Sequence, residues 1–185
     1  KTTFKCLYFL KQENIRKGDV VLFQHNNSWY IYPLLIASAI NGNLVISLAE
    51  ETNIHDTNKI ISSSKPKLIL SGDEIYSKIK DKKIGDKEFS NIDEDAKNCG
   101  LLIVYSSGTT GNPKGIVLTE RNLITNATGI EAIYNITEED VFYCVLPMSH
   151  MNALMITGIL PFITKSTIII DKPLNIQNAT FYFDN

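Results

Sequence analysis

The chain has 185 residues, of which 44% are hydrophobic and 21% are charged, so it is long and apolar enough to fold around one sizeable core. Its net charge is −2 at pH 7 and its pI is near 5.9, which excludes a global basic field of the kind that recruits nucleic acid. Because no apolar run reaches about 18 residues, we expect no transmembrane span, and the first residues lack the long apolar core and cleavage site of a signal peptide.

The first half of the chain alternates strand-like and helix-like patterns. We predict strands at 20–23, 44–48 and 67–70 and helices at 29–40 and 56–64. Pro33 predicts that the first of these helices is kinked or begins later, and Asn41-Gly42 marks its end. The segment Phe4 to Leu10 is compatible with either helix or strand. Residues 76–88 show only a weak alternation, and 89–100 is typical of a polar surface connection.

The second half continues the alternation, with predicted strands at 101–105, 141–146 and 167–170 and helices at 120–134 and 151–163. On the 120–134 helix, five apolar residues fall near one face: Leu123, Ile124, Ala127, Ile130 and Ile133. Strands that alternate with helices imply βαβ crossovers. The predicted fold class is therefore α/β, with a mostly parallel sheet and flanking helices, and no linker divides the chain into two domains.

The segment after the 101–105 strand is dense in hydroxyls and glycine and ends in Pro113-Lys114-Gly115. Clustered N–H donors, hydroxyls and one ammonium suit an anion, above all a polyphosphate. The candidate phosphate-binding residues are Ser106, Ser107, Gly108, Thr109, Thr110, Gly111 and Lys114. A Walker A loop is excluded because proline rather than glycine precedes the lysine, and the dinucleotide fingerprint G-x-G-x-x-G is absent.

A second candidate motif is Pro147-Met-Ser-His150, which follows the 141–146 strand. By itself it is weak evidence, since a helix-capping or packed histidine has the same appearance. His25 and His55 lie among polar residues, so we expect both at the surface. Three methionines, Met148, Met151 and Met155, either line an apolar pocket or belong to the core, and core is the favoured interpretation.

The three cysteines are odd in number and widely separated: Cys6, Cys99 and Cys144. No Cys-x-x-Cys pair occurs, and no histidine lies near a cysteine at the spacing of a metal site. We expect reduced thiols in a cytoplasmic protein and no metal site built from cysteine.

The stretch Tyr105 to Gly115 resembles the phosphate-loop signature of the adenylate-forming (AMP-binding) superfamily, which includes acyl- and aryl-CoA synthetases, luciferases and the adenylation domains of nonribosomal peptide synthetases. Weaker similarity extends over 15–171. The resemblance implies that residues 1–185 form the N-terminal portion of the AMP-binding domain. In that superfamily, Pro-x-x-His after a strand is typical of acyl- and aryl-CoA synthetases. His150 is therefore the candidate catalytic residue, near the carboxylate pocket, and it favours an acid without an α-amino group.

The resemblance also implies an activity and its cofactors. A carboxylic acid would react with ATP, with Mg²⁺ bridging phosphate oxygens, to give an acyl-adenylate and pyrophosphate, and a thiol such as coenzyme A would then take the acyl group. The superfamily's later motifs, a ribose-binding aspartate and a late catalytic lysine among them, are not found in the chain, so we expect residues 1–185 alone to be inactive. Two alternatives are kept: an amino-acid adenylation domain that feeds a carrier protein, and a non-catalytic nucleotide-binding module.

Overall fold

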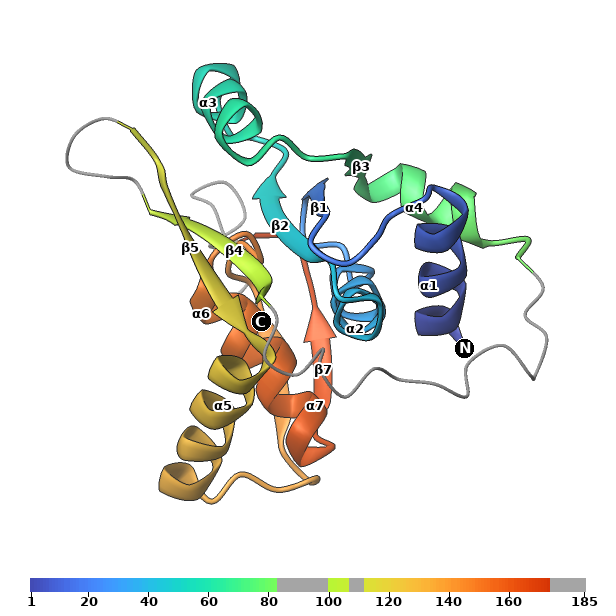
Figure 1. Cartoon of the computed structure of the whole chain (residues 1–185). Helices are drawn as coiled ribbons and strands as arrows, with labels where there is room; N and C mark the ends of the chain where they lie inside the picture. Colours follow the sequence, from blue (N-terminus) through green and yellow to red (C-terminus); the bar gives the residue numbers. More distant parts are fainter. Residues whose placement is uncertain (83–99, 107–111, 174–185) are drawn as a thin grey trace.

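The computed structural model describes residues 1–82, 100–106 and 112–173 (Figure 1). Most of the predicted phosphate loop, 107–111, and most of the predicted surface connection, 89–99, lie outside the described residues. In chain order the elements are α1 (Thr2–Gln12), β1 (Val20–His25), α2 (Ile31–Asn41), β2 (Leu44–Ala49), α3 (Ile54–Ser64), β3 (Leu68–Ser71), α4 (Gly72–Ile79), β4 (Gly100–Ser106), β5 (Lys114–Thr119), α5 (Glu120–Tyr134), β6 (Val141–Cys144), α6 (Met151–Leu154), a π-helical turn (Met155–Ile159), α7 (Leu160–Thr164) and β7 (Thr167–Ile170).

The main sheet has five strands in the order β3-β1-β2-β4-β5. The first four of these are parallel, and β5 runs antiparallel to β4 at the edge. Strands β6 and β7 form a separate parallel pair. The predicted α/β class with a mostly parallel sheet is confirmed, whereas the antiparallel β5 was not among the predicted strands.

The two faces of the sheet bury different residues because side chains alternate along each strand. One face packs on a large cluster that includes Phe23, Val45 and Leu102 together with apolar residues of α1, α2, α5 and α6. The other face packs on a smaller cluster around Leu22 and Ile46, which α3 covers. Figure 1 shows α3 on one side of β1 and β2 and α2 on the other.

The predicted boundaries of α2 follow from two residues. The helix begins at Ile31, so Pro33 lies in its first turn, where a missing N–H costs no helical hydrogen bond. It ends at Asn41, and the φ of 77° at the C-cap Gly42 is the left-handed conformation that glycine adopts without strain. The ambiguous segment Phe4 to Leu10 is helical and belongs to α1.

The predicted helix at 151–163 is interrupted by the π-helical turn, with Thr157 at φ −104° and ψ 17°. Pro161 has no N–H with which to bond the carbonyl of Thr157 four residues earlier, so that carbonyl needs another donor. The Tyr32 hydroxyl supplies it at 3.1 Å. The ring of Tyr32 fills the space where a Cβ on Gly158 would lie.

One helix was not predicted, and one predicted helix needs correction. Residues 72–79 form the unpredicted α4, which begins with a capping box between Ser71 and Glu74. On α5, Leu123 and Ala127 are buried as predicted, but Ile124 and Ile133 are 42% and 74% exposed. The apolar face of α5 is therefore narrower in the described structure than its sequence pattern indicates.

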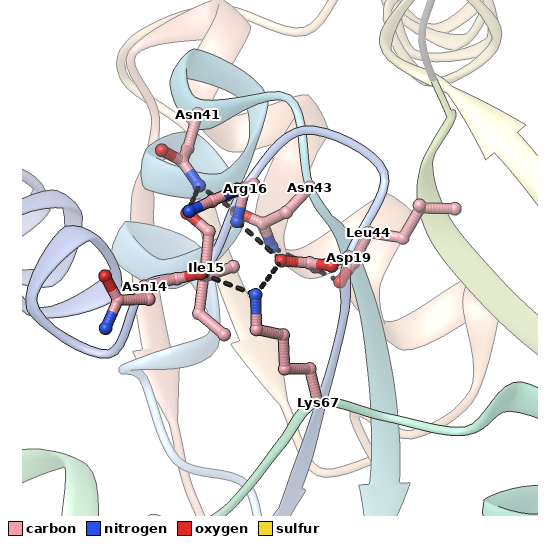
Figure 2. A network of polar contacts seen from close by, with 8 residues as sticks. All are labelled: Asn14, Ile15, Arg16, Asp19, Asn41, Asn43, Leu44 and Lys67. Carbon is pink, nitrogen blue, oxygen red and sulfur yellow. Dashed lines mark hydrogen bonds and ion pairs between the residues drawn. The ribbon is translucent and has the colours of Figure 1, made fainter.

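The amino ends of β1, β2 and β3 are joined by a polar network (Figure 2). The Asp19 carboxylate accepts from the backbone N–H of Arg16 at 2.7 Å and from Lys67 Nζ at 2.6 Å. The hydrogen bond and charge of Lys67 lower the pKa of Asp19. Asn41 Nδ2 donates to the carbonyl of Ile15 at 3.1 Å. These bonds fix the turn that leads into β1.

Cys6 and Cys144 are free and buried, as expected for reduced thiols, and burial raises the pKa of Cys6 to about 12. Cys99 lies outside the described residues. Among the residues that the structure describes, no helix has the length and apolar character needed to cross a membrane.

Candidate active site

The predicted phosphate loop connects β4 to β5, and its two ends are held together by that strand pairing. Ser106, the last residue of β4, lies opposite Lys114, the first residue of β5. Residues directly opposite each other in an antiparallel pair project from the same face of the sheet. Both residues are exposed. The Ser106 hydroxyl and the Lys114 ammonium thus stand at the base of the loop as neighbouring donors.

The next pair of residues along the hairpin, Tyr105 and Gly115, makes contacts on the opposite face of the sheet. Gly115 lies opposite Tyr105, and a Cβ on Gly115 would come within 3.2 Å of the Tyr105 ring and of Ile103. The tyrosine ring therefore packs over the glycine. The Tyr105 hydroxyl is hydrogen-bonded to Ser63 Oγ of α3 at 3.1 Å. This contact ties the exit of β4 to α3.

Strand alternation places Ser106 on the face of the larger core cluster. Leu102 belongs to that cluster and pairs with Val45 on β2, while Ile103 belongs to the smaller cluster. Ser106, four residues after Leu102, projects from the same face as Leu102. By the same alternation Ser47, two residues after Val45, projects from this face of β2. Ser106, Lys114 and Ser47 therefore share one face, near the carboxyl ends of parallel strands, where α/β proteins bind ligands.

His150 lies on a different element, at the start of α6. It is the N-cap of α6, exposed, and it makes no capping hydrogen bond with its side chain. Its backbone N–H donates to the Pro147 carbonyl at 3.0 Å, which closes the turn before α6. Met148, inside this turn, is 1% exposed and packs in the larger core cluster. The imidazole is therefore presented to solvent from a turn that is itself anchored in the core.

The expectation that His25 lies at the surface is wrong, because its side chain is 2% exposed. It continues the alternation of Val21 and Phe23, which both belong to the larger core cluster, and its ring stacks on Phe23 at 4.6 Å between centroids. Burial lowers the pKa of His25 to about 4. The alternation of side chains along β1 predicts that His25 is buried, but the polar residues that follow it favoured a surface position. His55 is exposed as expected.

His25 connects the sheet to the turn that carries His150. Its Nε2 is 2.9 Å from Ser47 Oγ, and Ser47 Oγ donates to the carbonyl of Met148 at 3.0 Å. This contact joins β1 and β2 to a residue two positions before His150. No local sequence pattern marks Ser47, because its partner lies 101 residues away in the chain.

Of the predicted site residues, Ser106 and Lys114 are paired at the open end of the hairpin, and His150 lies two residues after Met148, which Ser47 attaches to the sheet. Ser107, Gly108, Thr109, Thr110 and Gly111 lie outside the described residues, so their role stays a prediction. Met148 and Met155 are buried and Met151 packs against the same cluster, which confirms that the three methionines belong to the core.

Two hollows lie near these elements without containing Ser106, Lys114 or His150. An apolar cavity of about 450 Å³ lies between α2, α5 and α7, lined among others by Leu35, Leu123 and Phe162. A polar, open hollow of about 550 Å³ lies between α3 and the exit of the phosphate loop at Asn112 and Pro113. No group of three or more His, Cys, Asp or Glu side chains that could hold a metal ion occurs within residues 1–82, 100–106 and 112–173.

The family model of AMP-binding enzymes matches residues 8–182, so the chain belongs to the AMP-binding enzyme family. A sulfoacetate–CoA ligase of Cupriavidus necator is 34% identical over 84 residues, which cover 45% of this chain and 16% of that protein. A mitochondrial malonate–CoA ligase of Xenopus laevis is 30% identical over 143 residues, which cover 74% of this chain and 22% of that protein. The aligned stretches therefore span 16% and 22% of the length of these two relatives.

Solved structures show the same fold at low sequence identity. ATP-bound MatB from Rhodopseudomonas palustris superposes with a TM-score of 0.83 at 17% identity, over 100% of this chain and 41% of that one. McyG A-PCP complexed with phenylalanyl-adenylate gives a TM-score of 0.80 at 18% identity, over 99% of this chain and 33% of that one. The match shows that the described architecture is that of adenylate-forming proteins.

Proposed function

We propose that the chain supplies the phosphate-binding hairpin and part of the acid-binding site of an AMP-forming carboxylate–CoA ligase. In this proposal residues 1–185 are the N-terminal portion of the AMP-binding domain. The observation that carries it is the pairing of Ser106 with Lys114 at the base of the family's phosphate loop. A hydroxyl and an ammonium on one face can both donate hydrogen bonds, and the ammonium adds a positive charge, which suits the oxygen-rich, anionic tail of ATP.

The reaction would be attack of a carboxylate oxygen on the α-phosphorus of ATP, with formation of an acyl-adenylate and departure of pyrophosphate. Lys114 and Ser106 would hold the β- and γ-phosphates, together with the loop residues 107–111. His150 would line the pocket for the acid and orient its carboxylate. The chain's contribution is therefore positioning and charge stabilisation, the two means by which proteins accelerate transfer at phosphorus.

Mg²⁺ is part of the proposal only as a companion of the ATP phosphates. The described residues offer no cluster of three acidic, histidine or cysteine side chains for a metal ion. We therefore assign no residue of the described chain to Mg²⁺ and derive no step through it.

Coenzyme A is the proposed thiol acceptor, because the relatives of Cupriavidus necator and Xenopus laevis are named as CoA ligases. His150, exposed at the start of α6, further favours an acid without an α-amino group.

The second candidate is an amino-acid adenylation domain that feeds a carrier protein, which the structural similarity to McyG A-PCP favours. A cytoplasmic location belongs to the proposal as well, although the Xenopus relative is named as mitochondrial.

The test is nucleotide binding and acid-dependent pyrophosphate release by the intact protein, including any sequence that flanks residues 1–185. We expect Lys114→Ala to weaken ATP binding about tenfold or more, since a charge-assisted hydrogen bond is worth about 1.5–3 kcal/mol. Thr110→Val, which removes one predicted hydroxyl donor from the loop, should weaken ATP binding by a smaller factor. Lys78→Ala is the matched control, because Lys78 is an exposed lysine on α4, at the opposite edge of the sheet.

The two candidate functions separate in the same assay. Carboxylic acids without an amino group, offered with coenzyme A, should give acyl-CoA and pyrophosphate, whereas amino acids should not. Wild-type ATP affinity and turnover in both Lys114→Ala and Thr110→Val would contradict the proposed phosphate site.

A further inference from the structure

The turn between β1 and α2 makes a second set of contacts that reaches across the molecule. Asn27, in this turn, donates through Nδ2 to the carbonyl of Leu146 at 3.0 Å and to the carbonyl of Asp171 at 2.9 Å. Its Oδ1 accepts from the backbone N–H of Met148 at 2.9 Å. Both amide hydrogens and the amide oxygen of Asn27 are therefore used on backbone groups that lie 119 to 144 residues away.

These bonds enclose the turn that carries His150. Leu146 and Met148 flank Pro147, whose carbonyl in turn accepts from the backbone N–H of His150 at 3.0 Å. Asp171 follows β7, and its own N–H donates to the Cys144 carbonyl at the end of β6. One side chain thus fixes the exit of β6 and the exit of β7 at the same point.

The His25–Ser47 contact provides a second attachment, and its hydrogens can be assigned. The backbone N–H of Ser28 donates to His25 Nδ1 at 3.1 Å, so Nδ1 is an acceptor and the ring proton of the neutral imidazole is on Nε2. Nε2–H then donates to Ser47 Oγ, which leaves the Ser47 hydroxyl hydrogen for the carbonyl of Met148. Met148 is therefore held through its N–H by Asn27 and through its carbonyl by Ser47.

The backbone of Asn27 is adapted to this role. Its φ is 49°, in the left-handed region that asparagine, aspartate and glycine tolerate better than other residues. The neighbouring Asn26 is exposed. Of these two adjacent asparagines, Asn27 is the one whose side chain makes the long-range bonds to the 146–150 turn, so the pair offers a natural internal control.

We propose that Asn27 is a positioning residue for His150: its amide fixes the backbone of the 146–150 turn, with the Ser47 hydroxyl as a second attachment, and so sets where the imidazole stands relative to Ser106 and Lys114. The inference rests on the proposed function in one respect, namely that His150 contacts the acid. Misplacing a substrate-orienting group by about 1 Å can lower a rate about a hundredfold, so such an attachment has kinetic consequences.

The main variant is Asn27→Gly in the intact protein. Glycine keeps the left-handed backbone and removes all three side-chain hydrogen bonds, so the variant separates the loss of the amide from backbone strain. Asn26→Gly makes the same chemical change one residue earlier. Asn27→Asp keeps the acceptor for the Met148 N–H but directs a carboxylate oxygen at the carbonyls of Leu146 and Asp171, and it should resemble Asn27→Gly.

The first readout is hydrogen exchange of the Met148 amide, which needs no activity. We expect about tenfold or faster exchange in Asn27→Gly and wild-type exchange in Asn26→Gly. A Met148 amide that exchanges at the wild-type rate in Asn27→Gly overturns the proposal. This result stands even if the protein proves to activate no acid, in which case the proposed function fails separately.

The second readout is kinetic and distinguishes positioning from general destabilisation. Asn27→Gly should lower kcat/KM for the acid about tenfold or more while leaving the Kd for ATP within about twofold of wild type. The double variant Asn27→Gly/His150→Ala should be no worse than His150→Ala alone, because the amide would act only through the histidine. Fully additive losses, or equal losses in acid and ATP binding, would overturn the proposal.

Discussion

The two ends of the five-stranded sheet both carry polar networks, but the networks differ in exposure and in reach along the chain. At the amino end, the Asp19–Lys67 pair is 27% and 41% exposed, and its bonds join residues 3 to 53 positions apart. At the carboxyl end, His25 and Ser47 are 2% and 8% exposed, and the bonds of Ser47 and Asn27 to later elements span 101 to 144 positions. The first network closes turns within the sheet, and the second attaches a distant turn to it.

The difference in exposure between the two networks indicates which polar contacts affect function. A network exposed to water loses little when broken, because water replaces the missing partner. Breaking a buried network leaves donors and acceptors without partners, and each of these groups costs its full desolvation penalty. The segment that the network held in place is also freed. In this molecule the element that the buried network holds is the turn of His150. Mutations at the carboxyl end should therefore affect both stability and activity, and mutations at the amino end should affect stability only slightly.

The largest expected effect is the response of His25 to acid. Because burial lowers its pKa from 6.5 to about 4, the unfolded chain takes up a proton at a higher pH than the folded chain does. The free energy of unfolding should therefore fall as pH drops from 6.5 toward about 4, by about 3 kcal/mol when the titration is complete. Urea unfolding at pH 7 and at about pH 4 measures this change.

Other groups titrate in the same range, so the comparison is with His25→Gln. This variant cannot titrate at position 25, and its loss of stability over the same pH interval should be smaller by about 3 kcal/mol. Asp19 provides the contrast at the other end of the sheet. Its pKa is lowered, so its contribution is present above its ordinary value of 3.8 and is lost only as pH falls below that. Parallel pH profiles for wild type and His25→Gln would refute the assignment.

An intermediate effect is expected for Ser47→Ala. The substitution leaves His25 Nε2–H and the Met148 carbonyl without their shared partner, and an unsatisfied buried group costs about 1–3 kcal/mol. Denaturant unfolding of the intact protein measures the loss. Ser63→Ala is the control, since it removes an exposed bond to Tyr105 and should cost less than about 0.5 kcal/mol. The comparison fails if the two variants are equally stable.

The smallest effect is expected for Lys67→Met. The ion pair with Asp19 is partly exposed, so its loss should cost less than about 1 kcal/mol and should shrink further in 1 M salt. Pyrophosphate release should stay within about twofold of wild type, because the pair lies at the end of the sheet away from His150. A severalfold loss of activity with unchanged stability would show that the two ends are coupled.

Local sequence signals predict most of the elements that form the sheet. The β-branched runs of β1, β2, β4 and β7 and the full extent of α5 are confirmed. The helix α4 was not predicted although Ser71 and Glu74 form a capping box, because the residues after the cap alternate only weakly between apolar and charged. Strand β5 was not predicted; its residues Lys114 to Thr119 lie at the sheet edge and show no alternation of buried and exposed positions.

The candidate site is predictable from the sequence only in part. Ser106, Lys114 and His150 carry motifs that local sequence displays. Asn27 and Ser47 carry none, since an asparagine in a polar turn and a serine inside a strand become informative only when their partners are placed. Those partners lie 101 to 144 residues further along the chain, beyond the range of any periodicity.

This separation has a consequence for biosynthesis. A ribosome that adds about 5–20 residues per second emits the turn of Asn27 about 6–24 seconds before its partner Leu146, which lies 119 residues later. Strands β1, β2 and β3 are complete by residue 71 and can pair during that interval. The amide of Asn27 and the hydroxyl hydrogen of Ser47 would meanwhile lack their partners at Leu146, Met148 and Asp171. The contacts that position the His150 turn can therefore form only after the first three strands have been synthesised, so that turn is attached to the sheet late in synthesis.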